Sequence, residues 1–284
     1  MEDLVTNLPN LVSLTDGQWT MGSLILMVSY GAHFAFIIYF IMTSLQLAPR
    51  YRVVAVLSAV VMASAGMSLL REWSMWSDTF EFVAATGLWE PATGGQTFSN
   101  AYRYGNWTIT VPLLLIQLPI ALGLARGQLH KRSLRMIVPA LLMIWTGLYG
   151  QFGEANDFAQ LNIWGVISSL FFFWLIFEVW GVVKLGKTET PADLKPWAGN
   201  LFWYFLVTWG IYPIAYALPQ LGQDGNVVVA QQLLFSIADI STKLIYGVIL
   251  SRFCLRRSAI EGYEPAVLAL DTTGAGSSMA SRVE

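Results

Sequence analysis

Two residues of opposite charge lie one helical turn apart inside an otherwise apolar stretch near the end of the chain. The stretch QLLFSIADISTKLIYGVIL contains Asp239 and Lys243 and is long enough to cross a bilayer. Ionisable groups are costly inside a membrane, so their presence there indicates a functional site. The i, i+4 spacing puts both side chains on one helical face. A buried lysine on such a face can hold a carbonyl cofactor as a Schiff base, with the carboxylate as counterion; a purely structural ion pair is the alternative.

A stripe of polar side chains marks a second apolar segment, RYGNWTITVPLLLIQ. Asn106, Thr110 and Gln117 follow one another at helical spacings of four and seven, so they share one face of a helix. Arg103 lies in the same segment and must face a cavity if it is to stay inside a membrane. Such amides and hydroxyls either bind a ligand or, more commonly, make hydrogen bonds between helices.

A third segment, WGIYPIAY, has aromatic rings at spacings suited to the wall of a pocket. Trp209, Tyr212 and Tyr216 are three and four residues apart and therefore lie on one helical face. Pro213 lies among them and can kink the helix or leave a backbone carbonyl free. Glycines in the fourth span can let a ring approach closely. Aromatic belts at the membrane surface and ordinary helix packing are the alternatives.

The composition indicates that these segments lie in a membrane. The chain has 284 residues, of which 55% are hydrophobic and 12% charged, and its mean hydropathy is +0.55; soluble domains have about 25% charged residues. Seven apolar spans, each near the roughly 20 residues that cross a bilayer, cover residues 20–46, 53–75, 102–125, 133–152, 159–183, 197–220 and 228–254. The net charge of −2 argues against a basic nucleic-acid surface. A single cysteine, Cys254, excludes an internal disulfide, and the sequence has no Cys/His cluster for a metal.

The charges of the loops predict the orientation. Lys and Arg are concentrated in the first, third and fifth loops and after the last span, whereas the other side has mainly acids, among them Glu72, Glu90 and Glu154. The positive-inside rule therefore predicts a plasma-membrane protein with its N-terminus outside and its C-terminus in the cytoplasm. The external loop FEFVAATGLWEPATGGQTF alternates apolar and polar residues around a glycine-rich turn, which predicts a short β-hairpin.

We therefore expect an all-α membrane protein, a bundle of seven transmembrane helices with one extracellular β-hairpin between helices 2 and 3. Residues 19–257 form the transmembrane domain. Residues 1–18 form an extracellular segment that can include a short amphipathic helix on the membrane surface. Residues 258–284, which end in DTTGAGSSMASRVE, form a disordered cytoplasmic tail.

Taken together, these segments resemble the microbial (type 1) rhodopsins over nearly the whole chain. The motifs RYxxW, WxxYPxxY and DxxxK carry the resemblance, in RYGNWTITVPLLLIQ, WGIYPIAY and FSIADISTKLIYG. The family implies a retinal, all-trans in the dark, joined to Lys243 as a protonated Schiff base with Asp239 as counterion. By position, it also implies a retinal pocket made of Trp107, Met143, Thr146, Gly147, Ser168, Phe172, Trp209, Tyr212 and Tyr216.

The residues of the polar stripe indicate which kind of ion pump within this family the chain resembles. Proton-pumping relatives have carboxylic acids at the positions of Asn106 and Gln117, and sodium pumps have an aspartate at that of Thr110. The Asn-Thr-Gln combination resembles the light-driven chloride pumps, which implies an inward chloride transporter and not an enzyme. The chloride-binding residues would be Asn106, Thr110, Arg103, Trp107 and Ser64. The cytoplasmic path would pass Gln117 and Arg50, although Arg50 can equally be an ordinary positive-inside arginine.

A count of formal charges supports an anion site without the resemblance to chloride pumps. The protonated Schiff base and Arg103 each contribute one positive charge and Asp239 one negative charge, which leaves a net charge of +1. An uncompensated charge in a low-dielectric interior is expensive, so an external anion can neutralise it. The alternative is that Arg103 is compensated elsewhere, for example by an acid on the extracellular side.

Two other functions stay open at this point. The same pocket can serve a sensory photoreceptor that signals to a partner protein, or a light-driven pump for sodium or protons. The partners that we expect are chloride, the lipid bilayer and further copies of the chain, because this family commonly forms trimers or pentamers. We expect no nucleic acid and no metal ion among the partners.

Overall fold

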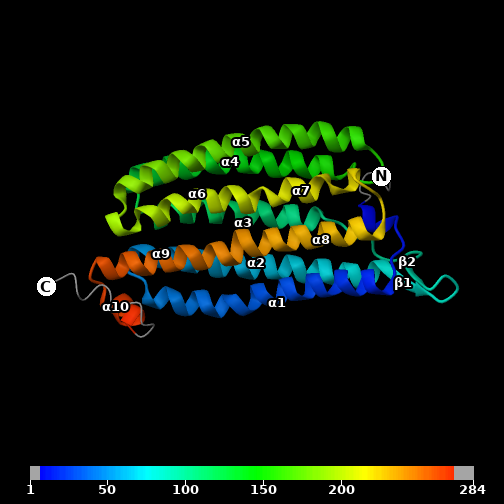
Figure 1. The fold of residues 1–284 in the computed structure, drawn as a ribbon, viewed down its shortest axis with the longest axis horizontal. Coiled ribbons are helices and arrows are strands. Elements are labelled where there is room, and N and C mark those ends of the chain that lie inside the picture. The colour runs from blue at the N-terminus through cyan, green and yellow to red at the C-terminus, as the bar shows by residue number, and fades with distance from the viewer. Residues whose placement is uncertain (1–6, 272–284) are drawn as a thin grey trace.

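Seven long helical rods lie side by side with nearly parallel axes (Figure 1). The structure, a computed structural model, describes residues 7–271. Five rods are single helices, α1 (Asp16–Gln46), α2 (Pro49–Thr79), α3 (Ala101–Ala121), α4 (Arg126–Gln151) and α5 (Phe158–Glu189). The sixth rod consists of α6 (Lys195–Trp209) and α7 (Ile211–Ala217), and the seventh of α8 (Gly225–Asp239), the π-helical segment η5 (Ile240–Ile245) and α9 (Tyr246–Ile260). The predicted all-α bundle of seven helices is confirmed.

Helix α3 contains the polar stripe. Within the described residues, the other six rods are long and apolar enough to cross a membrane, whereas α3 has these polar residues, with Pro112 and Pro119 in its interior. It contacts both α2 and α4, and its buried residues include Arg103 and Gln117. The polar groups of α3 therefore face the interior of the bundle.

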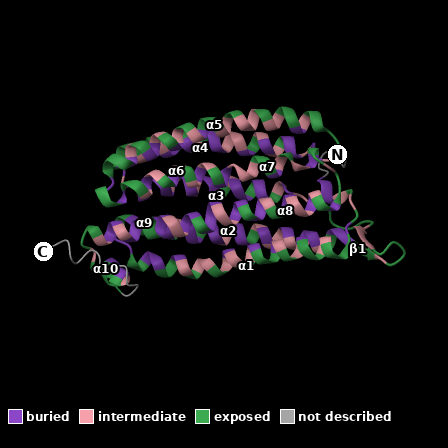
Figure 2. Cartoon of the chain, in the orientation of Figure 1, coloured by how far each residue is buried: buried purple, intermediate pink, exposed green. Residues whose placement is uncertain are grey.

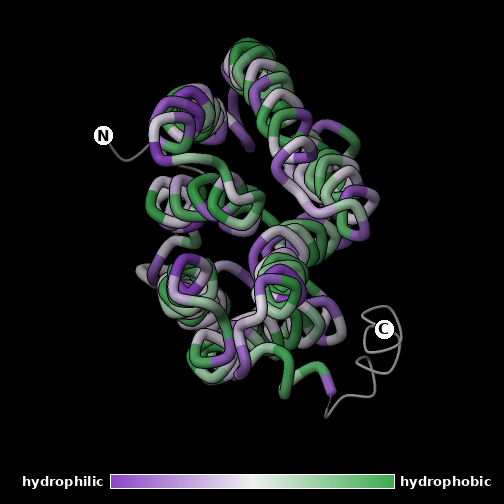
Figure 3. The backbone as a smooth tube through the Cα atoms, turned by 90° about the vertical axis from the view of Figure 1, so that its left-hand side faces the viewer, coloured by the Kyte–Doolittle hydropathy of each residue, from purple (hydrophilic) through white to green (hydrophobic). Residues whose placement is uncertain are grey.

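The outside of the bundle is apolar. Helix α5 exposes a row of large side chains at spacings of three and four residues, namely Ile163, Val166, Leu170, Phe173 and Phe177. Figure 2 shows buried positions concentrated in α2, α3, α8 and α9, and Figure 3, which looks along the bundle, shows hydrophobic residues on outward-facing turns as well. So large an exposed apolar surface fits a bundle surrounded by lipid.

A β-hairpin closes one end of the bundle, between α2 and α3 as predicted. Strands β1 (Phe80–Val83) and β2 (Leu88–Pro91) pair antiparallel. Gly87 in the turn has φ +70, a left-handed conformation that glycine adopts without strain. Trp89 ties the hairpin to the rest of the chain, because its backbone pairs with Leu14 and its ring stacks on Trp19 at 3.9 Å between centroids. We call this end of the bundle the hairpin end, and the opposite end the α10 end.

The predictions for the two terminal segments need correction. Between residue 7 and the start of α1 the structure has one 3-10 turn, η2 (Leu8–Asn10), in place of the expected surface helix; Leu8 and Leu14 are buried against the bundle. At the other terminus α9 continues to Ile260, and a further helix, α10 (Glu264–Asp271), follows. Helix α10 buries Ala266 and Leu270, one turn apart, which explains why this part of the expected disordered tail is ordered. Residues 1–6 and 272–284 lie outside the described part of the chain.

The sixth rod is interrupted where the aromatic segment predicted a kink. Helix α6 ends at Trp209, and α7 begins at Ile211. Pro213 lacks the N–H that would bond to the Trp209 carbonyl four residues earlier, so the regular ladder cannot continue through this point. The break lies at the level of the bundle where the aromatic rings of this segment face inwards.

Candidate functional site

Lys243 lies in the interior of the bundle, on the π-helical segment η5. Its Nζ contacts the carboxylate of Asp239, one turn earlier, and lies 3.2 Å from the Tyr212 hydroxyl. Single π-helical turns widen a helix locally and are frequent at functional sites. Tyr204 donates to the carbonyl of Ser241 at 2.7 Å, which satisfies a backbone group inside the irregular turn.

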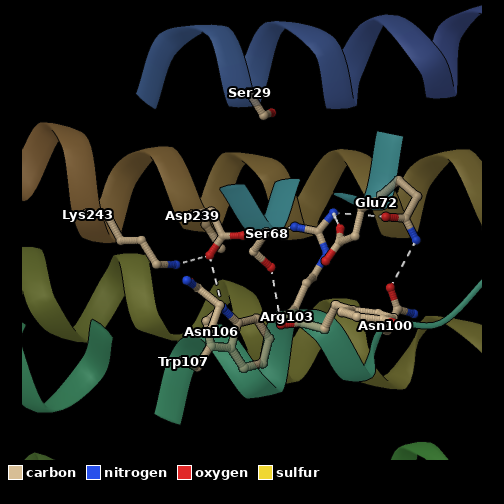
Figure 4. Close-up of polar contacts among 12 residues, drawn as sticks. Ser29, Ser68, Glu72, Asn100, Arg103, Asn106, Trp107, Asp239 and Lys243 are labelled. Carbon is tan, nitrogen blue, oxygen red and sulfur yellow. Dashed lines mark hydrogen bonds and ion pairs between the residues drawn. The ribbon is translucent and has the colours of Figure 1, made fainter. Parts of the chain in front are cut away.

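Asp239 is held by donors from three rods. Arg103 Nη1 and the Tyr212 hydroxyl each donate to its carboxylate at 2.8 Å, and Trp107 Nε1 donates at 3.1 Å. Together with Lys243, four groups therefore stabilise the ionised carboxylate, which is only 3% exposed. Groups from the third, sixth and seventh rods therefore meet at Asp239, and Figure 4 shows Asp239 between Lys243 and Arg103.

Arg103 bridges Asp239 to a second buried acid that the sequence analysis did not include in the site. Its Nη2 lies 2.8 Å from the carboxylate of Glu72 on α2, and both side chains are 0–1% exposed. The same Nη2 donates to Gln232 on α8 at 3.0 Å. Glu72 was assigned only to the acidic side of the membrane, although an acid within a long apolar helix is the same kind of signal as Asp239.

This second acid changes the charge of the site. Lys243 and Arg103 contribute two positive formal charges, and Asp239 and Glu72 contribute two negative ones when both acids are ionised. In that state the net charge is zero, as in the alternative in which an acid at the hairpin end compensates Arg103. The expected net charge of +1 applies when Glu72 is protonated. Sequence spacing could not reveal this pair because its members lie on different helices.

The polar stripe of α3 is buried beside these charges and contains no acid. Asn106 donates from Nδ2 to Ser64 Oγ on α2 at 2.8 Å, and the Thr110 hydroxyl donates to the Asn106 backbone carbonyl at 3.0 Å. Gln117 lies farther toward the α10 end, with its Oε1 3.5 Å from Ser58 Oγ. The structure thus brings Ser64 to Asn106, as predicted. Trp107, also predicted to bind an anion, instead donates its single N–H to Asp239.

An apolar cavity adjoins Lys243 between the rods. Its wall consists mostly of apolar and aromatic side chains with a few polar groups, which is typical of pockets for small molecules. The residues of the predicted retinal pocket that line it are Trp107, Met143, Gly147, Ser168, Phe172, Trp209, Tyr212 and Tyr216. Further lining residues, which the sequence analysis missed, include Tyr104, Leu114, Gly165, Pro213 and Phe235. An apolar cavity lined by aromatic rings, with the primary amine of Lys243 at its wall, fits a retinal joined to Lys243.

Thr146 is the one predicted pocket residue that does not line the cavity. Its hydroxyl bonds back to carbonyls of its own helix, at 2.7 Å to Leu142 and 3.2 Å to Met143. Thr146 is rotated by about 100° from Gly147 around the helix axis.

Two glycines make room for Tyr216, whose hydroxyl donates to the Leu161 carbonyl at 2.9 Å. A Cβ atom at Gly150 would lie 2.0 Å from the Tyr216 hydroxyl, and one at Gly165 would lie 2.8 Å from its ring. The expectation that glycine in the fourth span admits a ring is therefore confirmed at Gly150. The ring that approaches there belongs to the protein.

At the α10 end, Arg50 is not a free cation. It pairs with Glu261 and with the hydroxyl of Tyr51, while more than half of its side chain is exposed. Its predicted role on the anion path stays a prediction.

Another buried acid, Glu154, lies at the hairpin end in the loop between α4 and α5. It accepts from Gln231 Nε2 at 2.6 Å and from Asn7 Nδ2. Burial raises the pKa of Glu154 above its ordinary value, although these donors act in the opposite direction. The structure records no contact between Glu154 and Arg103, so its charge is separate from the Lys243 site.

Comparisons with known proteins agree with this arrangement. Residues 20–256 match the family model described as bacteriorhodopsin-like protein. The chain is 30% identical to xanthorhodopsin, described as a light-driven ion pump with dual chromophore; the two structures superpose with a TM-score of 0.80 over 89% of this chain and 100% of that one. A thermophilic rhodopsin gives 29% identity and a TM-score of 0.81, over 89% of this chain and 99% of that one. Bacteriorhodopsin-I of Haloquadratum walsbyi is 28% identical over 240 residues, 83% of this chain and 87% of that protein.

A family model that covers most of the chain, together with these structural relatives, decides the assignment. The chain belongs to the bacteriorhodopsin-like family of microbial rhodopsins, membrane proteins that bind retinal covalently and act as light-driven ion pumps or photoreceptors.

Proposed function

We propose that this rhodopsin is a light-driven inward chloride pump. The observation that carries the proposal is the α3 face beside the Lys243–Asp239 pair, which presents the amide of Asn106 and the hydroxyl of Thr110 and no carboxylate. An amide or an alcohol does not accept a proton at neutral pH, whereas both can donate hydrogen bonds to an anion.

The donors needed for a halide are present near this face. A primary amide has two N–H groups, and Asn106 uses one of them on Ser64. Ser64 accepts that bond, which leaves its own O–H to be donated. A chloride between Asn106, Ser64 and the cationic nitrogen of Lys243 would therefore be held by hydrogen bonds and by charge. Thr110 would add a donor only when its hydroxyl leaves the Asn106 carbonyl.

The cavity residues would hold the retinal that this mechanism needs. Lys243 would be its point of attachment, and Asp239 would balance the charge of the Lys243 nitrogen. When bound, retinal supplies light absorption and a change of shape in the all-trans chain. Trp107 and Trp209 line the cavity and would restrict that change.

The polar residues along the bundle suggest the direction of transport. Loop charges favour an extracellular hairpin end and a cytoplasmic α10 end. Chloride would then approach past Arg103, rest near Asn106 and leave past Gln117 and Ser58, which are buried on the cytoplasmic side of Thr110. A plasma-membrane location and a trimeric or pentameric assembly belong to the same proposal.

A second candidate is supported by the neutral charge of the site. Because Glu72 compensates Arg103, the four buried charges balance without any external anion. Such a site also suits a sensory photoreceptor or a pump for another ion. A structural relative with 19% identity and a TM-score of 0.62 is described as a light-driven proton pump, a similarity that concerns the fold alone.

Light-driven pH changes in cells that express the protein with retinal distinguish these candidates. We would record them in sodium chloride and in sodium sulfate, each with and without a protonophore. Inward chloride transport makes the interior negative and draws protons in, so the medium turns alkaline only with chloride and more strongly with protonophore. Acidification that a protonophore abolishes would mean proton export, and an alkaline signal in sulfate would mean sodium export. A coloured, photocycling protein with no signal in any salt would indicate a sensor.

The matched control is Asn106→Asp, tested in the same cells. A carboxylate at this position would repel chloride and could accept a proton, so the chloride-dependent alkaline signal should disappear. If Asn106→Asp pumped chloride as well as the original protein, the anion site would not lie beside Asn106.

A further inference from the structure

Glu72 is the buried charge that the proposed pump does not use. From the hairpin end toward Lys243, the side chains of Glu72, Arg103, Asp239 and Lys243 form one connected row of alternating charge (Figure 4). Each of the four is at most 4% exposed in its side chain. The row is electrically balanced while both acids are ionised.

A chloride ion added to a balanced site would leave one uncompensated negative charge in a dry interior. Burial of an unpaired charge is costly, and a titratable group in that situation usually changes its protonation state instead. We propose that chloride binds together with one proton, and that Glu72 takes up the proton. This inference rests on the proposed anion site and concerns how that site is regulated.

The hydrogen bonds indicate which of the two acids accepts the proton. Asp239 has four donors, as described above, and each of them stabilises its ionised form. Glu72 has its ion pair with Arg103, but neither of its oxygens accepts a hydrogen bond from the described residues. Protonation of Glu72 therefore loses less stabilisation of a carboxylate than protonation of Asp239 would.

Protonation of Glu72 would also change the partners of Arg103. While Glu72 is ionised, the two terminal nitrogens of the guanidinium face the two carboxylates. A neutral Glu72 holds Nη2 less strongly, so more of the positive charge is available to an anion that approaches from the hairpin end. The only new covalent bond is the O–H bond on Glu72, and its proton comes from the medium on that side.

Other charged and titratable groups lie near the row. The charged groups that act on Glu72 are Arg103 on α3 and Asp239 and Lys243 on the seventh rod. On α1, buried His33 lies near Asp239 and Lys243; its Nδ1 is 2.7 Å from the Ser29 carbonyl, and its Nε2 has no hydrogen-bond partner in the described chain. His33 is therefore the competing acceptor that an experiment must separate from Glu72.

The test measures chloride binding and proton uptake by the purified, retinal-bound protein in the dark. Sodium chloride is titrated against sodium sulfate, and binding is followed by the shift of the visible absorption band. A pH electrode in weakly buffered solution measures the protons taken up. We expect close to one proton per bound chloride, and a Kd that rises about tenfold per pH unit wherever Glu72 is ionised before binding.

Glu72→Gln should remove both effects. The amide has the shape of the protonated acid and no charge, so this variant should bind chloride with a pH-independent Kd equal to the low-pH limit of the original protein. Glu154→Gln is the matched control, because it changes a buried acid at the same end of the bundle that does not contact Arg103. It should keep the proton uptake and the pH dependence.

The outcomes separate this inference from the proposed function. Chloride binding without proton uptake in the original protein would overturn the inference and leave the chloride pump standing. Proton uptake that persists in Glu72→Gln would place the proton on His33 or another group and also overturn it. If chloride caused neither an absorption shift nor transport at any pH, the proposed function itself would be wrong.

A second variant keeps the test decisive if Glu72→Gln forms no pigment. Glu72→Asp retains a carboxylate, so proton uptake should persist. The infrared band of the protonated carboxyl that appears with chloride should then change frequency, because an aspartic acid replaces a glutamic acid. An unchanged band would mean that the proton resides on another acid, which would refute the role of Glu72.

Discussion

Arg103 offers the most direct test of the buried charge row. Replacing it with glutamine removes the only cation that contacts Glu72 in the described chain and one of the four donors to Asp239. Breaking a buried ion pair from one side costs about 3–5 kcal/mol, because a charge is left uncompensated. For a protein of this size that is equivalent to a fall of about 6–20 °C in melting temperature. We expect the melting temperature of Arg103→Gln to be lower than that of the original protein by this amount near neutral pH in chloride-free solution.

A double variant separates the effect of losing Arg103 from the cost of leaving the Glu72 carboxylate buried without a cation. In Arg103→Gln/Glu72→Gln no acid lacks a partner, because Asp239 keeps Lys243, Trp107 and Tyr212. The double variant should therefore recover at least half of the stability that the single variant loses. The loss in the single variant should also shrink at low pH, where Glu72 can take up a proton.

The assay is the thermal loss of the visible absorption band of the purified pigment. Arg71→Gln is a suitable control, since Arg71 precedes Glu72 on α2 but contacts the Tyr102 ring, at 5.6 Å, and no carboxylate of the described chain. A cation–π contact of this kind contributes about 0.5–1 kcal/mol. If the melting temperature of the double variant were no higher than that of Arg103→Gln, Glu72 would not be an ionised partner of Arg103, and the balanced charge row would be refuted.

Lys243→Ala should abolish the visible absorption band when retinal is supplied, and a band that persisted in the purified protein would show that retinal is attached elsewhere. Tyr212→Phe removes a hydroxyl that lies 2.8 Å from Asp239 and 3.2 Å from Lys243; it should lower the stability of the pigment by about 1.5–3 kcal/mol, measured by thermal bleaching, and no change would mean that the hydroxyl does not support the charge of Asp239. Burial raises the pKa of Glu154, so its contribution to stability is complete below the unfolded value of about 4.3 and is lost as the pH rises through the folded pKa. The melting temperature of Glu154→Gln minus that of the original protein should therefore be larger at neutral pH than near pH 4. Each kcal/mol of difference in stability corresponds to about 2–4 °C. A temperature difference that does not change with pH would contradict the raised pKa.

The rods and the centre of the site could be predicted because local spacing determines both. Apolar runs of sufficient length predict the spans, and the helices extend these runs by a few residues at most ends. Asp239 and Lys243 are four residues apart, so one helix is enough to bring them together. The rings of Trp209 and Tyr212 face the same cavity because a three-residue spacing keeps them on one helical face.

The features that were missed depend on contacts between distant parts of the chain. Glu72 meets Arg103 because of how α2 is rotated against α3, and a single sequence does not specify that rotation. Gly165 and Phe235 line the cavity for the same reason. Helix α10 was assigned to a disordered tail because the prediction for residues 258–284 relied on the Gly- and Ser-rich sequence at its end. The burial of Ala266 and Leu270 depends on the surface that α1 and α9 provide.

The two helices that flank the charge row therefore have different roles in the proposed mechanism. On α3, the amide of Asn106 and the hydroxyl of Thr110 offer no place for a proton beside Lys243, which favours transport of an anion. On α2, Glu72 balances Arg103 and opposes the binding of that same anion until a proton arrives. The residues of α3 would then determine which ion is carried, and the acid on α2 would determine at what pH it binds. A relative with the same α3 residues but a neutral side chain at the position of Glu72 should bind chloride with little dependence on pH.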